Sequence, residues 1–406
     1  MDKLKLNFIT LWKLNDWGMY NRRDEAILWE LTRRDSVESV LHVEHTTLKA
    51  LIYRMLQLFR PSDKVLRNIN LLHIKKGLSL KPVRLKDNMK YFIYSVVILY
   101  TGNSPFIKKM TNYLMNIQYH AINKYYCRAK KNIIIIAYPP SKYLSRAIMT
   151  IRHDLLIADF EDDTAERVDI KRRNEVIENY RKILPQCRWI FSTSPSLNEK
   201  YRNLAGQEIA YIPNGVDVNN FKAYHQHSYL KMKNQKTVGY IGIINREVDL
   251  DLLDYLLSCF KNISFFIIGY ATEERLIDIK RLIAKYSNLH YLGYKCYKDI
   301  PDYISEFDVL INIKKPDHTT AGGESQKIYE YLLSGKPIVS TPVPPADRFS
   351  EIIYVAEDKY QFAENIKKAL NEKNNDIKEK RKETALNNSW SKRTDDILFK
   401  IQSLLR

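Results

Sequence analysis

Residues 324–341, ESQKIYEYLLSGKPIVST, contain the side chains best suited to hold an anion. A helix that begins near Ser325 would point its free backbone amides and the positive end of its dipole at such a ligand, and Lys327 lies in the first turn. Glu330 follows three residues later on the same helix face. This pattern suits a nucleoside diphosphate, with Lys327 on the phosphates and Glu330 on the ribose hydroxyls. The alternative is an ordinary surface ion pair between positions i and i+3.

A glycine turn, Gly239–Tyr240–Ile241–Gly242, closes a predicted strand. A glycine at this place lets the backbone approach a phosphate or a sugar closely. The next residues are IINREV, so the GxGxxG fingerprint is absent and a dinucleotide oxidoreductase is disfavoured. Arg246 and Asp249 follow in the loop. The alternative is a tight turn with solvated charges.

An acidic run, DFEDD at residues 159–163, ends another predicted strand. Ligands of open parallel sheets bind at the carboxyl ends of the strands, so one carboxylate could be a general base that deprotonates an acceptor hydroxyl. Two alternatives stay open at this point. The run could bind Mg²⁺, or Asp162 or Asp163 could cap a helix that begins near Thr164.

A fourth candidate is the loop after the first predicted strand, which contains Gly18, Arg22 and Arg23. Gly18 would permit a close approach and the arginines could meet an anion, although arginines at a helix start are often only solvated. The four cysteines show no CxxC or Cys/His spacing, and the histidines show no metal-ligand or triad spacing. We therefore expect no zinc site, disulfide framework or catalytic triad.

Strands and helices that alternate along the chain must position these residues. In the second half, strands are predicted at 237–243, 263–269, 289–292, 309–313 and 337–341, with helices at 250–260, 273–285, 299–307, 326–334 and 360–373. In the first half, strands are predicted at 6–12, 37–43, 132–137, 152–160 and 189–194, with helices at 24–34 and 164–184 and long helical patterns within 48–130. Such alternation is typical of right-handed βαβ units and a parallel sheet. The 406 residues fit two domains, and the seam is expected near 213–220.

The positive charge is concentrated in one half of the chain. Residues 1–220 hold 36 of the 65 basic and 22 of the 47 acidic side chains, a net charge of +14, whereas the remainder carries only +4. Residues 46–150 contain 19 basic side chains and two acidic ones. This asymmetry predicts a polyanionic partner or surface. The apolar run at 91–100 is about half the ~20 residues of a spanning helix, and no signal peptide is predicted.

Taken together, the chain resembles nucleotide-sugar glycosyltransferases of the GT-B fold, in the family-4-like group of bacterial surface-polysaccharide biosynthesis. The resemblance extends over nearly the whole chain. Its motifs are Trp17 with Arg23 and the helix to Leu31, IADFEDD at 157–163, STSPSLNEKY at 192–201, YIPNGVDVNNF at 211–221, GYIGIINREVDLDLL at 239–253, KIYEYLLSGKPIVST at 327–341 and SWSKRTDDIL at 389–398.

The resemblance implies roles for individual residues. Lys327 would contact the donor diphosphate and Glu330 the ribose, Gly242 and Arg246 would line the phosphate loop, and Gly18 would form the opposite wall. Asp159 or Asp162 would be the base in an inverting enzyme.

One departure from the family pattern leaves the stereochemistry open. Many retaining members have a carboxylate eight residues before the second glutamate. That position is Gly322 here, and Glu324 stands six residues before.

The resemblance also implies an α/β architecture of two Rossmann-like domains whose parallel sheets face each other across a cleft. Residues 1–214 would bind the acceptor, residues 215–385 would bind the nucleotide sugar, such as a UDP- or GDP-sugar, and a helix at 386–406 would cross back to the first domain. No metal or further cofactor is expected. The predicted activity is hexosyl transfer to a glycan, lipid-linked at the inner face of the cell membrane, where the basic region 46–150 would dock on anionic lipid. The protein is therefore expected to be cytoplasmic and peripheral to the membrane.

Three other functions are alternatives to this one. A GT-B nucleotide-sugar 2-epimerase would release free sugar and nucleotide without an acceptor. A catalytically silent relative would bind glycan or nucleotide only. Nucleic-acid binding is disfavoured, because no RRM, helix-turn-helix, KH or zinc-finger pattern is present.

Overall fold

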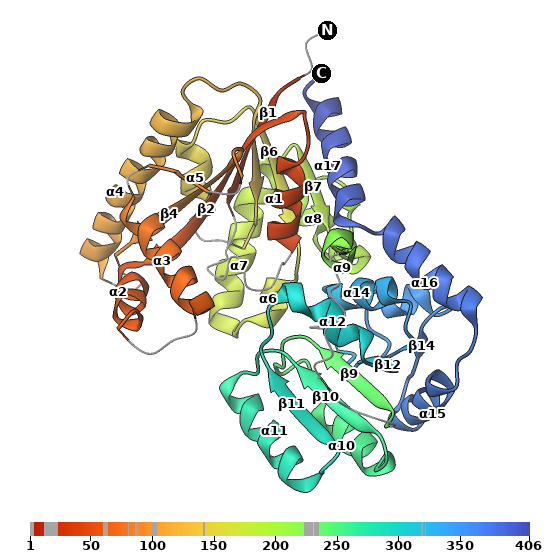
Figure 1. The fold of residues 1–406 in the computed structure, drawn as a ribbon. Coiled ribbons are helices and arrows are strands. Elements are labelled where there is room, and N and C mark those ends of the chain that lie inside the picture. The colour runs from red at the N-terminus through yellow and green to blue at the C-terminus, as the bar shows by residue number, and fades with distance from the viewer. Residues whose placement is uncertain are drawn as a thin grey trace. The chain divides into compact units, whose positions relative to one another are not determined.

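The computed structural model describes residues 4–11, 23–59, 64–79, 81–85, 88–99, 104–140, 143–222, 230, 235–317, 320 and 322–406. The chain divides into two compact units. The first comprises Met1–Tyr211 with Asp396–Arg406, and the second comprises Ile212–Asp395. Each unit is an α/β domain with helices packed on a largely parallel sheet (Figure 1).

The first unit contains an eight-stranded sheet in the order β3-β4-β2-β1-β5-β6-β7-β8, in which β3 runs antiparallel to β4 and the other neighbours are parallel. The central strands consist almost wholly of buried side chains, as expected for strands covered on both faces. The strands are β1 (Leu6–Leu11), β2 (Val37–Thr47), β3 (Val83–Arg84), β4 (Tyr91–Ile98), β5 (Ile133–Ala137), β6 (Leu155–Phe160), β7 (Trp189–Ser192) and β8 (Ile209–Tyr211).

Helices cover this sheet and leave from the ends of its strands (Figure 1). Buried residues of α4, α5, α7 and α8 form one apolar core with alternate residues of the strands. The helices are α1 (Arg23–Thr32), α2 (Leu48–Gln57), α3 (Lys64–Leu78), α4 (Pro105–Ile122), α5 (Leu144–Thr150), α6 (Thr164–Arg167), α7 (Ile170–Ile183) and α8 (Pro195–Ala205), with the π-helical segment η1 (Asn123–Cys127) and the 3-10 turn η2 (Leu184–Gln186).

The second unit contains a six-stranded parallel sheet in the order β11-β10-β9-β12-β13-β14. Its strands are β9 (Thr237–Ile241), β10 (Ser264–Ile268), β11 (Leu289–Gly293), β12 (Val309–Asn312), β13 (Ile338–Ser340) and β14 (Tyr354–Val355). Its helices and turns are α9 (Val218–Lys222), α10 (Leu250–Cys259), α11 (Glu273–Lys285), η3 (Tyr297–Asp299), α12 (Ile300–Ser305), α14 (Gln326–Ser334), η4 (Ala346–Phe349), α15 (Lys359–Leu370) and α16 (Asn375–Asn387). Helix α17 (Trp390–Leu404) ends the chain, and its residues from Asp396 onward group with the first unit.

Alternate residues of β9 point to the two faces of this second sheet, as the period of a strand requires. Val238 and Tyr240 join the core under α10 and α15, and Ile241 joins the core under α12 and α14. Gly239 lies against the Phe307 ring, because a Cβ there would stand 2.2 Å from the ring. The predicted fold class, two domains on parallel sheets, is confirmed.

The structure also corrects some predicted elements. The helix predicted at 164–184 is two helices, because the Asp169 carboxylate accepts from the amides of Lys171 and Arg172 and so starts α7 afresh. The apolar run at 91–100, to which no element was assigned, forms β4 beside β2.

Candidate functional site

Helix α14 carries the site on its first turn. It begins after Ser325 and ends at Gly335, whose φ of +72° is the left-handed conformation that glycine adopts readily. Ile328 and Tyr331 anchor one side of the helix in the core, so its amino-terminal end is held firmly. The Ser325 hydroxyl is buried and has no hydrogen-bond partner among the described residues, which leaves a polar group available at this helix end.

Lys327 and Gly242 lie against each other, as the sequence predicted for parts of one site. The Lys327 Nζ atom donates to the Tyr240 hydroxyl oxygen at 3.0 Å and stands 4.5 Å from the centre of that ring. A Cβ at Gly242 would lie 2.7 Å from the Lys327 Cε atom, and the φ of Gly242 is +151°. Gly269 is equally constrained, since a Cβ there would meet the Gly242 carbonyl oxygen at 1.9 Å. The glycines therefore make room for the lysine and for the backbone around it.

The charges of Lys327 and Glu330 are set by their surroundings. Burial lowers the pKa of Lys327 to about 8, against the attraction of Glu247 and Glu330. Burial raises the pKa of Glu330 to about 7, against hydrogen bonds from Gln326 and Tyr297 and the charge of Lys327. Glu330 is 7% exposed and forms no ion pair with Lys327, so the surface-pair alternative is wrong.

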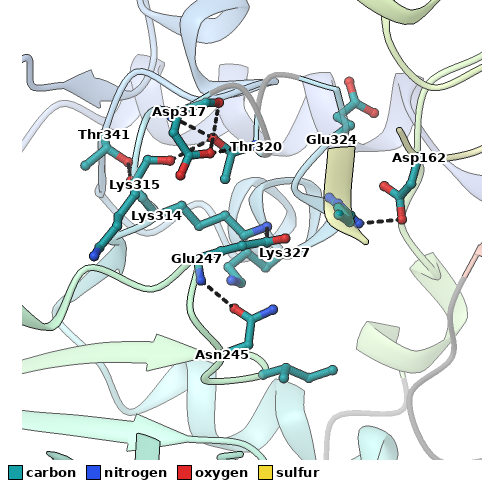
Figure 2. A network of polar contacts seen from close by, with 12 residues as sticks. Asp162, Asn245, Glu247, Lys314, Lys315, Asp317, Thr320, Glu324, Lys327 and Thr341 are labelled. Carbon is teal, nitrogen blue, oxygen red and sulfur yellow. Dashed lines mark hydrogen bonds and ion pairs between the residues drawn. The ribbon is translucent and has the colours of Figure 1, made fainter. Parts of the chain in front are cut away.

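Two loops next to this helix carry charges that the sequence analysis missed (Figure 2). The Glu247 carboxylate forms an ion pair with the Lys314 ammonium at 2.9 Å. The Lys315 amide donates to the Glu247 carbonyl oxygen at 2.8 Å, and the Thr341 hydroxyl donates to the Lys314 carbonyl oxygen at 2.6 Å. One signal was available, because Lys314 follows β12 at its carboxyl end, where ligands of parallel sheets bind.

Glu324, two residues after the position where the family pattern has a carboxylate, is held by residues of the second unit. Its side chain is 0% exposed, and one of its carboxylate oxygens accepts from the Asn214 amide at 2.6 Å. The other oxygen forms an ion pair with Arg348. Both oxygens are thus occupied, and Glu324 braces the start of α14 against the segment after β8.

Two predicted contacts stay predictions. Arg246 is exposed, and the structure shows its carbonyl oxygen accepting from Arg275 at 3.2 Å. Gly18 lies outside the described residues.

In the first unit the acidic run spreads its carboxylates in different directions. Asp159 is fully buried on β6, and both its oxygens accept from the Arg23 Nε atom, at 2.8 and 3.1 Å. Burial raises the pKa of Asp159, opposed by Arg23. Asp162 forms an ion pair with Arg167 at 2.7 Å and its side chain is 19% exposed. A base role therefore suits Asp162 better than Asp159, and for both it stays a prediction.

Asp163, the last residue of the run, caps α6. Its carboxylate accepts from the Glu166 amide, from Lys200 at 2.7 Å and from the Tyr201 hydroxyl at 2.8 Å. The predicted cap is confirmed. Within the described ranges, no group of three or more His, Cys, Asp or Glu side chains could hold a metal ion.

The comparisons with known proteins agree with this geometry. Residues 235–372 match the family described as glycosyl transferases group 1. The putative teichuronic acid biosynthesis glycosyltransferase TuaH of Bacillus subtilis is 24% identical over 196 residues, which are 46% of this chain and 49% of the relative. The match thus spans about half the length of that curated relative.

Solved structures match over nearly the whole chain. Sucrose-phosphate synthase from Thermosynechococcus elongatus has a TM-score of 0.69 at 11% identity, covering 99% of each chain. Anabaena HepE in complex with UDP and glucose has a TM-score of 0.65 at 14% identity, covering 98% of this chain and 100% of that one. WaaG, a glycosyltransferase involved in lipopolysaccharide biosynthesis, has a TM-score of 0.61 at 11% identity, covering 98% and 99%. These comparisons confirm the GT-B fold and the predicted resemblance to glycosyltransferases of surface-polysaccharide pathways.

Proposed function

We propose that this GT-B chain is a glycosyltransferase that moves a sugar from a nucleoside-diphosphate sugar to a glycan acceptor. The observation that carries the proposal is the Lys327 ammonium, which lies in the first turn of α14 and forms no ion pair with any described residue. Negative charge grows on the leaving diphosphate as the sugar departs, and a fixed cation with helix amides stabilises that charge. Glu330, one turn deeper, would accept from the ribose hydroxyls.

In the proposed reaction, the acceptor hydroxyl oxygen attacks the anomeric carbon while the bond from that carbon to the phosphate oxygen breaks. The diphosphate keeps the electron pair, and Lys327 neutralises it. In an inverting enzyme, Asp162 or Asp159 would take the hydroxyl proton. We propose no metal or further cofactor, since Lys327 and the helix amides supply the positive charge.

Two comparisons support the nature of the substrates. HepE was solved with UDP and glucose and with UDP alone, which favours a nucleotide-sugar donor. TuaH is described as acting in teichuronic acid biosynthesis and WaaG in lipopolysaccharide biosynthesis, which favours a growing surface glycan as the acceptor.

We further propose that the acceptor is lipid-linked and that the first unit docks on an anionic membrane at the cytoplasmic side. Helix α4 supports this, because it is apolar on two sides. Met115, Tyr119 and Ile122 belong to the core. An outer stripe at helical spacing is exposed to solvent and consists of Phe106 (72%), Met110 (39%), Tyr113 (63%) and Ile117 (49%). An exposed apolar stripe of this size indicates an interaction surface.

Helix α2 repeats this pattern. It begins where β2 ends, and β2 pairs in parallel with β4, the strand before α4, so both helices follow the same edge of the sheet. Its exposed apolar side chains include Ile52, Tyr53 and Leu56, followed by Phe59. Exposed lysines lie beside both stripes, at positions 49, 108 and 109, and neither helix contains an acidic residue. No helix of the described residues is long and apolar enough to cross a membrane.

Vesicle flotation tests the membrane proposal. Vesicles with anionic lipid should retain the protein and neutral vesicles should not, because each basic residue near an anionic leaflet contributes on the order of 1 kcal/mol. The double variant Lys108→Gln/Lys109→Gln should weaken binding, and Lys367→Gln/Lys368→Gln on α15 of the second unit is the matched control. Equal binding to anionic and neutral vesicles would refute the proposal.

Thermal shift with UDP, GDP, ADP and CMP tests the donor site. We expect one nucleoside diphosphate to raise the melting temperature, since a ligand that binds only the folded state stabilises it. Lys327→Ala should abolish the shift and Lys285→Ala, on the outer helix α11, should not. No shift with any nucleotide would indicate a silent relative. Release of free sugar and nucleotide from the donor without an acceptor would indicate the epimerase alternative.

A further inference from the structure

We propose that Lys314 is a second cation for the donor diphosphate, held in position by Glu247. The inference rests on the proposed nucleotide-sugar site and adds to it a residue that neither the sequence motifs nor the comparisons assign.

The backbone of Lys314 is fixed from three sides. An isolated antiparallel bridge joins Val248 to Lys314, the Asp249 amide donates to the Ile313 carbonyl oxygen at 2.8 Å, and the Lys315 amide donates to the Glu247 carbonyl oxygen at 2.8 Å. The segment after β9 and the segment after β12 are thereby joined into one platform, and these two strands are neighbours in the sheet. This platform fixes the position of the Lys314 Cα atom, from which the side chain extends.

The Lys314 side chain is oriented and yet accessible. Its Nζ atom lies 2.9 Å from the Glu247 carboxylate, and the two side chains are 20% and 11% exposed. An ammonium has three N–H donors, and among the described residues Glu247 is the partner that Lys314 has. Lys314 can therefore keep Glu247 and still donate to a phosphate oxygen.

Lys314 and Lys327 both act on the Tyr240 hydroxyl. The Tyr240 hydroxyl accepts from Lys327, and the charges of Lys314 and Glu247 also act on this hydroxyl. Figure 2 shows Lys314, Glu247 and Lys327 close together beside α14. A diphosphate has several acceptor oxygens, so the free N–H donors of a second fixed ammonium add charge-assisted hydrogen bonds to those of Lys327. Arg246 is predicted to line the phosphate loop, and Lys314, held by its ion pair with Glu247, would be a further cation beside it.

Calorimetric titration of the Lys314→Met variant tests the assignment. The ligands are the nucleoside diphosphate that stabilises the wild type and the monophosphate of the same base. We expect diphosphate binding to weaken about 10-fold to 100-fold, the usual effect of losing one charge-assisted hydrogen bond, and monophosphate binding to change less. The affinity of the variant should also depend less steeply on salt, since one charge fewer takes part.

Two further variants complete the experiment. Lys314→Arg keeps the charge and should restore most of the affinity. Lys285→Met is the matched control, because Lys285 also pairs with one carboxylate, that of Asp254 at 2.8 Å, on the outer side of the second unit. If Lys327→Ala abolishes diphosphate binding while Lys314→Met binds as the wild type does, the inference is wrong and the proposed donor site stands. If the wild type binds no diphosphate, both are wrong.

Discussion

Two buried ion pairs of the first unit differ from the charge at the start of α14 in the second unit. In the first unit, Asp159 on β6 receives Arg23 at 2.8 Å, and Glu44 on β2 receives Lys76 at 3.0 Å, with no side chain of either pair more than 1% exposed. In the second unit, the Lys327 ammonium contacts a phenol and forms no ion pair with a described residue.

We interpret this difference as one between charges that serve the fold and a charge that, in the proposed function, binds a ligand. A buried ion costs free energy unless a counter-ion and hydrogen bonds compensate it. The first unit supplies the counter-ion from its own helices, so the charge is satisfied on folding. The second unit leaves Lys327 incompletely compensated beside a helix end and an open Ser325 hydroxyl, an arrangement that an incoming anion would complete.

The largest expected effect is the loss of stability when a buried ion pair of the first unit is broken. Asp159→Asn removes the carboxylate that pairs with the buried Arg23 guanidinium and should lower the free energy of unfolding by about 3–5 kcal/mol. Lys76→Met, which removes the ammonium that pairs with Glu44 at 3.0 Å, should act in the same direction. Urea unfolding followed by hydrogen exchange in β6 and β2 measures both.

Asp162→Asn is the matched control for Asp159→Asn, because the Asp162–Arg167 pair is partly exposed and should contribute only ~0–1 kcal/mol. If Asp159→Asn left stability unchanged and abolished sugar transfer, Asp159 would be the base and not part of the fold.

Elements and site residues could be predicted from the sequence where the pattern that determines them lies within one segment. Helix α14 has the predicted bounds 326–334, because a helix period, a starting Ser325 and a closing Gly335 all lie within one segment. The same locality explains why Lys327 and Glu330 could be chosen from their spacing. Gly242 was found from its position at a strand end, although the structure shows Lys327 filling the space that its missing side chain leaves.

The sequence was insufficient where two distant segments meet. Arg23 and Asp159 are 136 positions apart, and Glu247 and Lys314 are 67 apart, so nothing local links them. The sequence therefore predicts Asp159 as a candidate base and cannot show that Arg23 pairs with it. The run at 91–100 shows a further limit, because a short apolar stretch reads equally as a strand or a buried helix until its neighbour β2 is known.

The pH dependence of nucleotide affinity gives a second test of the difference between the two kinds of charge. Burial holds the pKa of Lys327 near 8, so the ammonium is charged below pH 8 and loses its proton above it. The affinity for a nucleoside diphosphate should therefore begin to decline as the pH approaches 8 and fall up to tenfold per pH unit above 8, until the pKa of the bound state is reached. The ligand does not titrate there, since a terminal phosphate has a pKa near 6. Calorimetric titrations between pH 7 and 9.5 measure this.

Glu330 should determine the acidic limb of the same profile of nucleotide affinity against pH. Its pKa of about 7 means that the carboxylate gains a proton as the pH falls below 7, which weakens its bond to the ribose hydroxyls. Lys327→Arg should remove the alkaline limb and leave the acidic one, because a guanidinium stays charged throughout. An alkaline limb that survived in Lys327→Arg would assign it to another group.

The smallest expected effect concerns stability without nucleotide and has the opposite sign to the first. The pKa of Lys327 is lowered on folding, so its charged form is disfavoured in the folded state below pH 8, and this loss of stability disappears as the pH rises from about 8 to 10.5. Lys327→Met should therefore raise the free energy of unfolding at pH 7 by ~1 kcal/mol, after loss of the contacts with the Tyr240 ring and hydroxyl. The gain should vanish near pH 10.

With nucleotide present, the wild type should be more stable than Lys327→Met, because the bound diphosphate stabilises the wild type and not the variant. Denaturant unfolding at pH 7 and pH 10, with and without the diphosphate, measures all four values, and Lys285→Met, an exposed pair, should stay within about 0.5 kcal/mol of the wild type throughout. A Lys327→Met variant that is less stable than the wild type without nucleotide would mean that Lys327 serves the fold as Lys76 does, and the distinction between the two units would be lost.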